Sequence, residues 1–176
     1  MLRHYFPNAY APSVFAIDFG KLYAMGYRGL IFDVDNTLVH HGDDSTPEID
    51  ALFRHLHAIG FATLLLSNND APRLERFNRN IGTRYIEDAA KPAPDSYLRA
   101  VEMLGLPNEQ VLCIGDQVFV DILGANRCGL KSILVHYIET GNKEWIGFKR
   151  YIEKLILFLF RFRSSRHKLC NIRKQV

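Results

Sequence analysis

Short apolar runs alternate with longer amphipathic segments along most of this chain. Strands that are buried on both faces of a sheet read as continuous apolar runs, because neither side of such a strand meets water. The alternation of these runs with helical segments predicts an α/β fold, a doubly wound parallel sheet with helices on both faces. The runs occupy residues 29–32, 63–66, 85–86, 111–114 and 132–135.

The segment from Pro47 to Gly60 carries the clearest helix signal. Thr46 or Ser45 precedes it as an N-cap, Pro47 suits the first helical position, and Gly60 suits the end. Its apolar residues recur at helical spacing and so share one face: Ile49, Leu52, Phe53 and Leu56. Further helices are predicted from Pro72 to Gly82, from Pro94 to Leu104, over 118–128, and near 14–25 within the leading residues 5–28.

The chain has 176 residues, of which 48% are hydrophobic, and this is enough to form one hydrophobic core. Its charge is unevenly distributed. Residues 1–142 hold 12 Lys and Arg against 17 Asp and Glu, a charge of −5, whereas residues 143–176 hold 10 against 2, a charge of +8. We therefore expect a domain over 1–142, a basic amphipathic C-terminal helix and tail over 143–176, and an anionic partner for that tail.

Residues 145–163 predict a helix whose orientation the sequence leaves open. Leu157 and Phe160 fall among basic residues, and exposed apolar residues in that setting are typical of a helix lying on an anionic membrane. The alternatives are binding of the tail to RNA or the ribosome through phosphates, and contact within the protein or with a protein partner. Docking on the domain core would use the opposite stripe: Phe148, Tyr151, Ile152, Leu155, Leu159 and Phe162.

Several features of the sequence favour a cytoplasmic protein. The longest apolar run, Leu155–Phe160, has six residues, far fewer than a bilayer-spanning helix needs. The first twenty residues lack the continuous apolar stretch of a signal peptide. The three cysteines form no paired motif, which indicates free thiols in a reducing compartment. A membrane-docked tail would place the protein peripherally on the inner face of the membrane.

Polar residues follow the predicted strands at the points where they end. Asp33 and Asp35 come directly after the run 29–32, and open α/β sheets bind ligands at this edge. Two close carboxylates repel each other unless a cation neutralises them or their proton affinities differ; a turn capped by Asp and Asn is the simpler alternative. Three later segments bring further polar residues to the same edge, namely Ser67, Lys91, and Asp116 with Asp121.

In order and spacing, these four segments resemble the motifs of the haloacid dehalogenase superfamily, over roughly residues 29–135. Finer features resemble the YqeG-like group of subclass IIIA phosphatases, which is related to phosphatidylglycerophosphate phosphatases. These features are Asn36, the Ser67-Asn68-Asn69 triplet, and the stretch from Gly115 to Arg127. A bacterial receiver domain also combines acids with a lysine, but in another order, and a dehalogenase would lack the acid at Asp35.

The resemblance implies a phosphomonoester hydrolase that works through a covalent intermediate. Asp33 would be the nucleophile and would form an aspartyl-phosphate, while Asp35 would act as general acid for the leaving group and then as base for water. Mg²⁺, which prefers oxygen ligands, would be held by Asp33, by the backbone carbonyl of Asp35, and by Asp116.

The remaining matched residues would bind the phosphate or support the site. Ser67 and the backbone N–H of Asn68 would donate to the phosphoryl oxygens, and Thr37 would either do the same or brace the loop. Lys91 would supply a fixed positive charge over the nucleophile and the phosphate. Asp121 would hold Lys91 or a water of the metal.

The spacing of the motifs also bears on the substrate. In this family, a cap domain that covers small substrates is inserted after the first motif or between the second and third. Only 29 residues separate Thr37 from Ser67 and 23 separate Ser67 from Lys91, and one helix and one strand use up each interval. We therefore expect a capless, open site, with a phosphatidylglycerophosphate-type lipid as lead substrate. The competing class is a phosphatase-like binding or assembly protein that contacts RNA, the ribosome or a protein through its basic tail.

Overall fold

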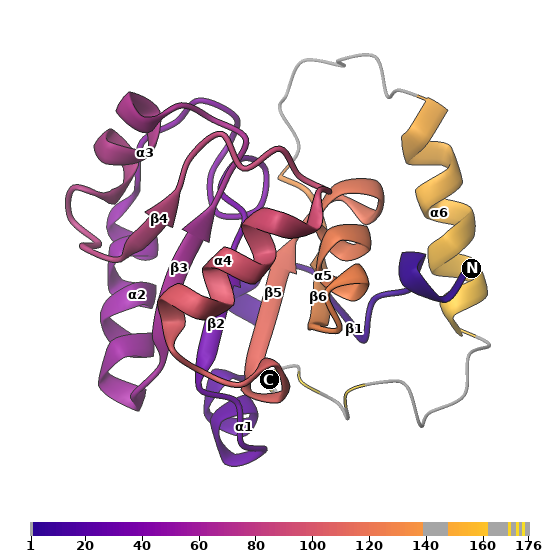
Figure 1. The fold of residues 1–176 in the computed structure, drawn as a ribbon, viewed down its shortest axis with the longest axis horizontal. Coiled ribbons are helices and arrows are strands. Elements are labelled where there is room, and N and C mark those ends of the chain that lie inside the picture. Colours follow the sequence, from indigo (N-terminus) through magenta and orange to yellow (C-terminus); the bar gives the residue numbers. More distant parts are fainter. Residues whose placement is uncertain (1, 139–147, 162–168, 170–171, 173, 175–176) are drawn as a thin grey trace.

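Six parallel strands form one sheet in the described part of the chain (Figure 1). The computed structural model describes residues 2–138, 148–161, 169, 172 and 174. The strand order is β1-β6-β5-β2-β3-β4 and every neighbouring pair is parallel, which confirms the predicted α/β sheet. The strands are β1 (Ala9–Ala11), β2 (Gly29–Phe32), β3 (Ala62–Leu66), β4 (Arg84–Ile86), β5 (Val111–Gly115) and β6 (Lys131–Val135).

Helices cover both faces of this sheet, as expected for a doubly wound fold. Successive residues of a strand point to opposite faces, so β2 contributes to both hydrophobic clusters. Leu30 and Phe32 pack on the side of α1 (Phe19–Ala24), α2 (Pro47–Ile59) and α3 (Ala71–Asn78). Ile31 packs on the other side, with Tyr97 and Ala125. That side carries α4 (Pro94–Leu104) and α5 (Leu123–Arg127).

Four short helical turns and one further helix complete the described elements. The turn η4 (Val118–Ile122) is a π-helical turn that leads directly into α5. The other turns are η1 (Leu2–Tyr5), η2 (Val14–Ala16) and η3 (Asn108–Gln110), and the last helix is α6 (Phe148–Arg161).

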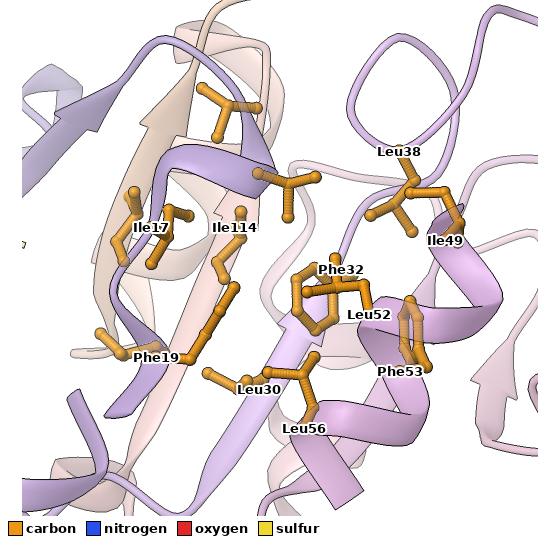
Figure 2. Packing of buried hydrophobic residues seen from close by; sticks show 14 of the residues in the cluster. Ile17, Phe19, Leu30, Phe32, Leu38, Ile49, Leu52, Phe53, Leu56 and Ile114 are labelled. Atoms are coloured by element: carbon orange, nitrogen blue, oxygen red, sulfur yellow. The ribbon is translucent and has the colours of Figure 1, made fainter. Parts of the chain in front are cut away.

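The helix α2 forms as its sequence predicts. The Thr46 hydroxyl accepts a hydrogen bond from Ile49 N at 3.3 Å, which caps the first turn. Gly60 ends the helix with φ 107°, a left-handed conformation that glycine adopts without strain. The apolar face of the helix points toward β2 in Figure 2, where the rings of Phe32 and Phe53 lie 5.2 Å apart. Burial of this face holds α2 against the sheet at about 1.5–3 kcal/mol per large side chain.

The register of the central strands determines where the site lies. Phe32, the last residue of β2, pairs with Leu65 of β3 and with Ile114 of β5. The polar residues that follow these strands therefore leave the sheet at the same edge. Within residues 2–138, neither the link from β2 to α2 nor the chain from β3 to α4 holds an inserted domain, so the core is capless as expected.

The leading segment differs from the predicted single helix near residues 14–25. Residues 9–11 form the edge strand β1, in which Ala9 pairs with Ile133 of β6. Asp18 then caps the short α1 by accepting a hydrogen bond from Lys21 N at 2.9 Å. The sequence Ala-Tyr-Ala has no β-branched residue, so its strand form depends on pairing with β6 rather than on local preference.

The stripe that periodicity assigned to docking on the core does not match the side of the C-terminal helix that packs on the domain. Leu155 and Leu159, assigned to the stripe that docks on the core, are 57% and 48% exposed. Glu153, assigned to the polar side, is buried, and Phe160 is half-buried. The prediction for the Leu157 side chain, and those for residues 145–147, 162 and 163, lie outside the described residues. No helix in the described part of the chain is long and apolar enough to cross a bilayer.

Tertiary contacts explain this difference. Ile156 of α6 packs against Val118, Ile122 and Leu134, and Glu153 bonds to the backbone of η4. A buried backbone N–H needs an acceptor, so the glutamate is turned inward although residues of this type mostly lie on the surface. The described residues of the tail also return to the domain, because Ile172 is buried in the core and its carbonyl accepts from Asp18 N at 2.7 Å.

Candidate active site

Asp33 lies at the end of β2 with its carboxylate held by two donors. Its backbone N–H still donates to Ile114 O at 2.9 Å, so the sheet fixes its position. Thr37 Oγ1 donates to Asp33 Oδ2 at 2.8 Å, and Lys91 Nζ donates to Asp33 Oδ1 at 2.6 Å. The carboxylate is thus buried and oriented from both sides, as a nucleophile in a preorganised site needs to be.

The loop after Asp33 folds back on itself and brings Thr37 to the carboxylate. Asn36 adopts a left-handed φ of 62°, which asparagine tolerates better than most residues, and its N–H donates to Val39 O at 2.7 Å. The Thr37 N–H donates to Val34 O at 3.3 Å, which closes the turn. The contact of the Thr37 hydroxyl with Asp33 is the one expected of a residue that braces the loop, and its contact with phosphate stays a prediction.

Lys91 reaches the nucleophile from a loop that Asn68 fixes in place. The Asn68 side chain accepts a hydrogen bond from Lys91 N at 2.8 Å and donates one to Lys91 O at 3.4 Å. Lys91 Nζ donates to Asp121 Oδ1 at 2.8 Å in addition to Asp33. Burial alone would lower the pKa of the lysine, but the two carboxylates outweigh it and raise the pKa, so the ammonium stays charged.

Three buried carboxylates gather around this ammonium. Asp33, Asp116 and Asp121 each place an oxygen within 4.8 Å of the others. Burial raises the pKa of Asp33 to about 6; Asp121 adds to this rise, whereas the charge of Lys91 opposes it. One ammonium does not balance three carboxylates, and buried like charges are costly. The donor set is all oxygen and strongly anionic, so it fits a divalent cation such as Mg²⁺.

The π-helical turn η4 places Asp121 in this cluster. Asp121 Oδ2 accepts a hydrogen bond from Gln117 N at 3.1 Å, so the carboxylate caps the turn that carries it. Gly115 at the end of β5 has no room for a side chain, because a Cβ there would overlap the Asp121 carboxyl group. The glycine before Asp116 is therefore required for the two acids to converge.

Asp35 faces another set of partners. Its carboxylate accepts hydrogen bonds from Asn69 Nδ2 at 2.8 Å, Arg73 Nη2 at 3.1 Å and Gly42 N at 3.3 Å, and His41 Nδ1 lies 2.8 Å away. Burial raises the pKa of Asp35, but these donors and charges outweigh it and hold the pKa below its usual range. Asp33 and Asp35, two residues apart, thus differ in proton affinity, because the pKa is raised at Asp33 and lowered at Asp35.

Ser67 joins the Asp35 side of the site through Asn69. The Ser67 hydroxyl accepts from Asn69 N at 3.2 Å and from Asn69 Nδ2 at 2.9 Å. Ser67 N donates to Ile86 O at 3.1 Å, and Ala89 N donates to Ser67 O at 3.0 Å, so the end of β4 fixes its backbone. The serine is nearly fully buried.

The structure therefore brings together the predicted residues in two connected groups. In the first group, Lys91 links Asp33 to Asp121, and Asp116 lies close by. The side chain of Asn68 holds the backbone of Lys91 in this group. Asn69 links Ser67 to Asp35.

Sequence reasoning gives no role at Asp35 to three side chains that contact it: Asn69, Arg73 and His41. Arg73 lies three residues after the cap Asp70, near the start of α3 at the same sheet edge, but the sequence alone does not separate it from the other arginines of that helix. Only its burial, at 8% exposed, distinguishes it from the exposed Arg76.

Such a site, with a buried aspartate beside a fixed ammonium and an acid cluster that could hold a cation, is typical of hydrolases that act on phosphate esters. A profile described as haloacid dehalogenase-like hydrolase matches residues 41–129. The protein named probable phosphatase YqeG from Bacillus subtilis is 33% identical over 89% of this chain and 92% of its own length. The chain belongs to the haloacid dehalogenase-like hydrolases, and within them to the phosphatases.

More distant relatives extend the comparison. A protein named phosphatidylglycerophosphate phosphatase 1, chloroplastic, from Chlamydomonas reinhardtii is 26% identical over 84% of this chain and 59% of its own length. Among solved structures, an uncharacterized protein from Listeria monocytogenes aligns with a TM-score of 0.55 at 15% identity, over 77% of this chain and 99% of that one. The cobalt-bound deoxy-D-mannose-octulosonate 8-phosphate phosphatase from Haemophilus influenzae aligns with a TM-score of 0.52 at 19% identity, over 81% and 96%. The two structures share the fold.

Proposed function

We propose that the protein is a Mg²⁺-dependent phosphomonoesterase in which Asp33 is the nucleophile. The observation that carries the proposal is the position of Lys91 Nζ, which lies 2.6 Å from Asp33 Oδ1 and 2.8 Å from Asp121 Oδ1. A fixed ammonium at this place orients the nucleophile and offsets negative charge on a phosphoryl group bound next to it.

The reaction takes two steps at one aspartate. In the first, an oxygen of Asp33 bonds to phosphorus as the bond to the leaving oxygen breaks, and Asp35 delivers a proton to that oxygen. In the second, Asp35 accepts a proton from water as the water oxygen bonds to phosphorus and the bond between phosphorus and the Asp33 oxygen breaks, which releases phosphate and regenerates the Asp33 carboxylate. The ionised resting state of Asp35 suits the second step. The negative charge of a bound phosphate favours the protonated form that the first step needs.

The remaining groups position the phosphate and a metal. Ser67 and the Asn68 N–H are the proposed donors to the phosphoryl oxygens. Asp33, Asp116 and the Asp35 backbone carbonyl are the proposed ligands of Mg²⁺, with Asp121 supporting Lys91 beside them. When bound, the cation supplies positive charge that offsets the acids and the phosphate.

The proposed substrate is a phosphomonoester on a lipid, of the phosphatidylglycerophosphate type. Three observations support it: the named activity of the 26%-identical relative, the absence of an inserted domain over the site within residues 2–138, and the basic tail. We place the protein in the cytoplasm, with the basic tail as its contact to the inner face of the membrane. The boundary between a catalytic part, 1–142, and that tail, 143–176, remains a prediction.

A screen of phosphate release tests this function. Lipid, sugar, nucleotide and phosphopeptide monoesters are compared at equal concentration, with Mg²⁺ and with a chelator. We expect Mg²⁺-dependent release and a preference for the lipid ester. A preference for a soluble ester would contradict the substrate while leaving the chemistry intact, and no release from any ester would contradict both.

The alternative function is a phosphatase-like binding protein that contacts RNA or the ribosome. The charge of +8 over residues 143–176 favours this alternative, because a basic segment that binds nucleic acid releases counterions and thereby gains affinity. Salt-sensitive co-sedimentation with ribosomes, together with absent ester hydrolysis, would support this alternative.

A further inference from the structure

Helix α6 presents an apolar face that the rest of the described chain leaves exposed. Leu155, Phe158 and Leu159 are 57%, 53% and 48% exposed. Residues at spacings of three and four share one side of a helix, so these three side chains form one surface, here called the α6 face. We propose that the α6 face is a docking surface for an anionic lipid bilayer, a proposal that rests on the lipid ester proposed above and names the surface that reaches it.

The opposite side of the helix is already used, and this fixes how the α6 face is presented. Glu153 is 7% exposed, and its Oε1 accepts a hydrogen bond from Val118 N at 3.0 Å. Ile156 packs on Val118, Ile122 and Leu134. A helix needs only one apolar side to dock on a domain. About half of each side chain on the α6 face remains exposed in the described chain, and exposed apolar surface of this kind marks interaction sites.

The charge around the helix selects the partner. Residues 143–176 carry 10 Lys and Arg against 2 Asp and Glu, and the remainder of the chain has a charge of −5. The partner is therefore anionic. Within α6 the sequence supplies Lys149, Arg150, Lys154 and Arg161.

The apolar side chains then distinguish between anionic partners. Basic residues strengthen binding to RNA because they neutralise its phosphates, whereas exposed leucine side chains add little to that binding. Both residue types strengthen binding to an anionic bilayer, because apolar side chains enter the boundary of the acyl chains while Lys and Arg remain at the headgroups. The combination of Leu155, Phe158 and Leu159 with a basic segment thus favours lipid over nucleic acid.

The inner side of α6 connects this surface to the proposed active site. Val118, which bonds to Glu153, opens the turn η4, and the same turn carries Asp121. Asp116 lies two residues before Val118. In Figure 1, α6 stands beside the β6 side of the sheet and begins toward the end of the molecule where the strands finish. Helix α6 is thus linked through Glu153 and Val118 to the turn that carries Asp121.

Vesicle co-sedimentation tests the proposal without depending on catalysis. The probes are vesicles of phosphatidylcholine with phosphatidylglycerol, which carries no phosphomonoester, and vesicles of phosphatidylcholine alone. The full chain should sediment with the anionic vesicles and be released by salt. Leu155→Glu together with Leu159→Glu should weaken this binding by at least about tenfold and leave turnover of a soluble aryl phosphate unchanged. Leu98→Glu, at a leucine 51% exposed on α4, is the matched control and should bind as the wild type does.

Each other outcome has a defined meaning. A folded double variant that binds vesicles as the wild type does would overturn the proposal, as would a wild type that binds ribosomes but no vesicles. If the glutamate pair does not fold, Leu155→Ala with Leu159→Ala keeps the helix and must still weaken binding. Vesicle binding without hydrolysis of any lipid ester would refute the proposed substrate and leave the docking surface standing.

Discussion

Lys91 Nζ donates a hydrogen bond of 2.6 Å to Asp33 Oδ1, from a residue 58 positions away in the sequence. The same ammonium bonds Asp121, so one buried cation connects the end of β2 and the turn η4 with the loop before α4. Without this charge, buried carboxylates would face each other across the sheet edge. The ion pair between Lys91 and Asp33 therefore has two roles: it stabilises the buried carboxylates, and it positions a charge for the proposed reaction.

Replacement of this lysine should separate the two roles. Lys91→Met removes the charge but keeps most of the side-chain volume, and we predict a loss of kcat of roughly 10²–10³-fold toward an aryl phosphate. The variant should also unfold at lower temperature, because Asp33 and Asp121 lose their shared partner. Lys131→Met, at an exposed lysine, is the control. Turnover of Lys91→Met equal to that of the control would show that the ammonium takes no part in catalysis.

The stability of the metal-free protein should depend on the protonation of Asp33. Burial raises the pKa of Asp33 from 3.8 to about 6. Between these values the folded protein binds more protons than the unfolded chain, so the free energy of unfolding falls as pH rises through this window. The loss attributable to this group is up to ~3 kcal/mol. Urea unfolding of the wild type and Asp33→Asn at pH 4 and pH 7, with chelator, measures the difference.

Addition of Mg²⁺ gives the complementary result. Since the cation binds ionised carboxylates, it should raise the urea midpoint of the wild type at pH 7 and have less effect on Asp33→Asn. Equal effects on both proteins would argue against Asp33 as a ligand.

Arg73 should matter for catalysis although it lies outside the predicted motifs. Its guanidinium donates a hydrogen bond to Asp35 Oδ1 at 3.1 Å and another to the backbone carbonyl of Asp43. We predict that Arg73→Met lowers kcat by roughly 10–100-fold with little change in KM, because a displaced Asp35 transfers protons poorly. Arg73→Lys should recover part of this loss. Arg76→Met, at a half-exposed arginine on the same helix, should have no effect.

The sheet and its helices could be predicted because the signals are local. The continuous apolar run at Gly29–Phe32 and the caps Thr46 and Gly60 act within a few residues of the elements they define. The edge strand Ala9–Ala11 could not, since its strand form comes from a pairing with β6 more than a hundred residues away. The family resemblance supplied the site residues, and the geometry adds how they touch.

Long-range contacts also explain what the sequence missed at the site and in the tail. Asn69 and Arg73 reach Asp35 from 34 and 38 positions away, so no local spacing reveals them. The side of α6 that faces the domain carries Glu153, because the buried Val118 N–H needs this side chain as its acceptor. Hydrophobic periodicity, which treats a glutamate as a surface residue, assigns that helix the wrong face.

Phosphate release by Asp33→Asn tests the central claim most directly. The substrate is an activated aryl phosphate with Mg²⁺, and Asp50→Asn serves as a matched control because Asp50 is an equally buried carboxylate that bonds Ser45 and Asn80 away from the site. We predict that Asp33→Asn loses activity by about 10⁴-fold or more, while Asp50→Asn, if folded, retains it. Undiminished phosphate release by folded Asp33→Asn would contradict the account.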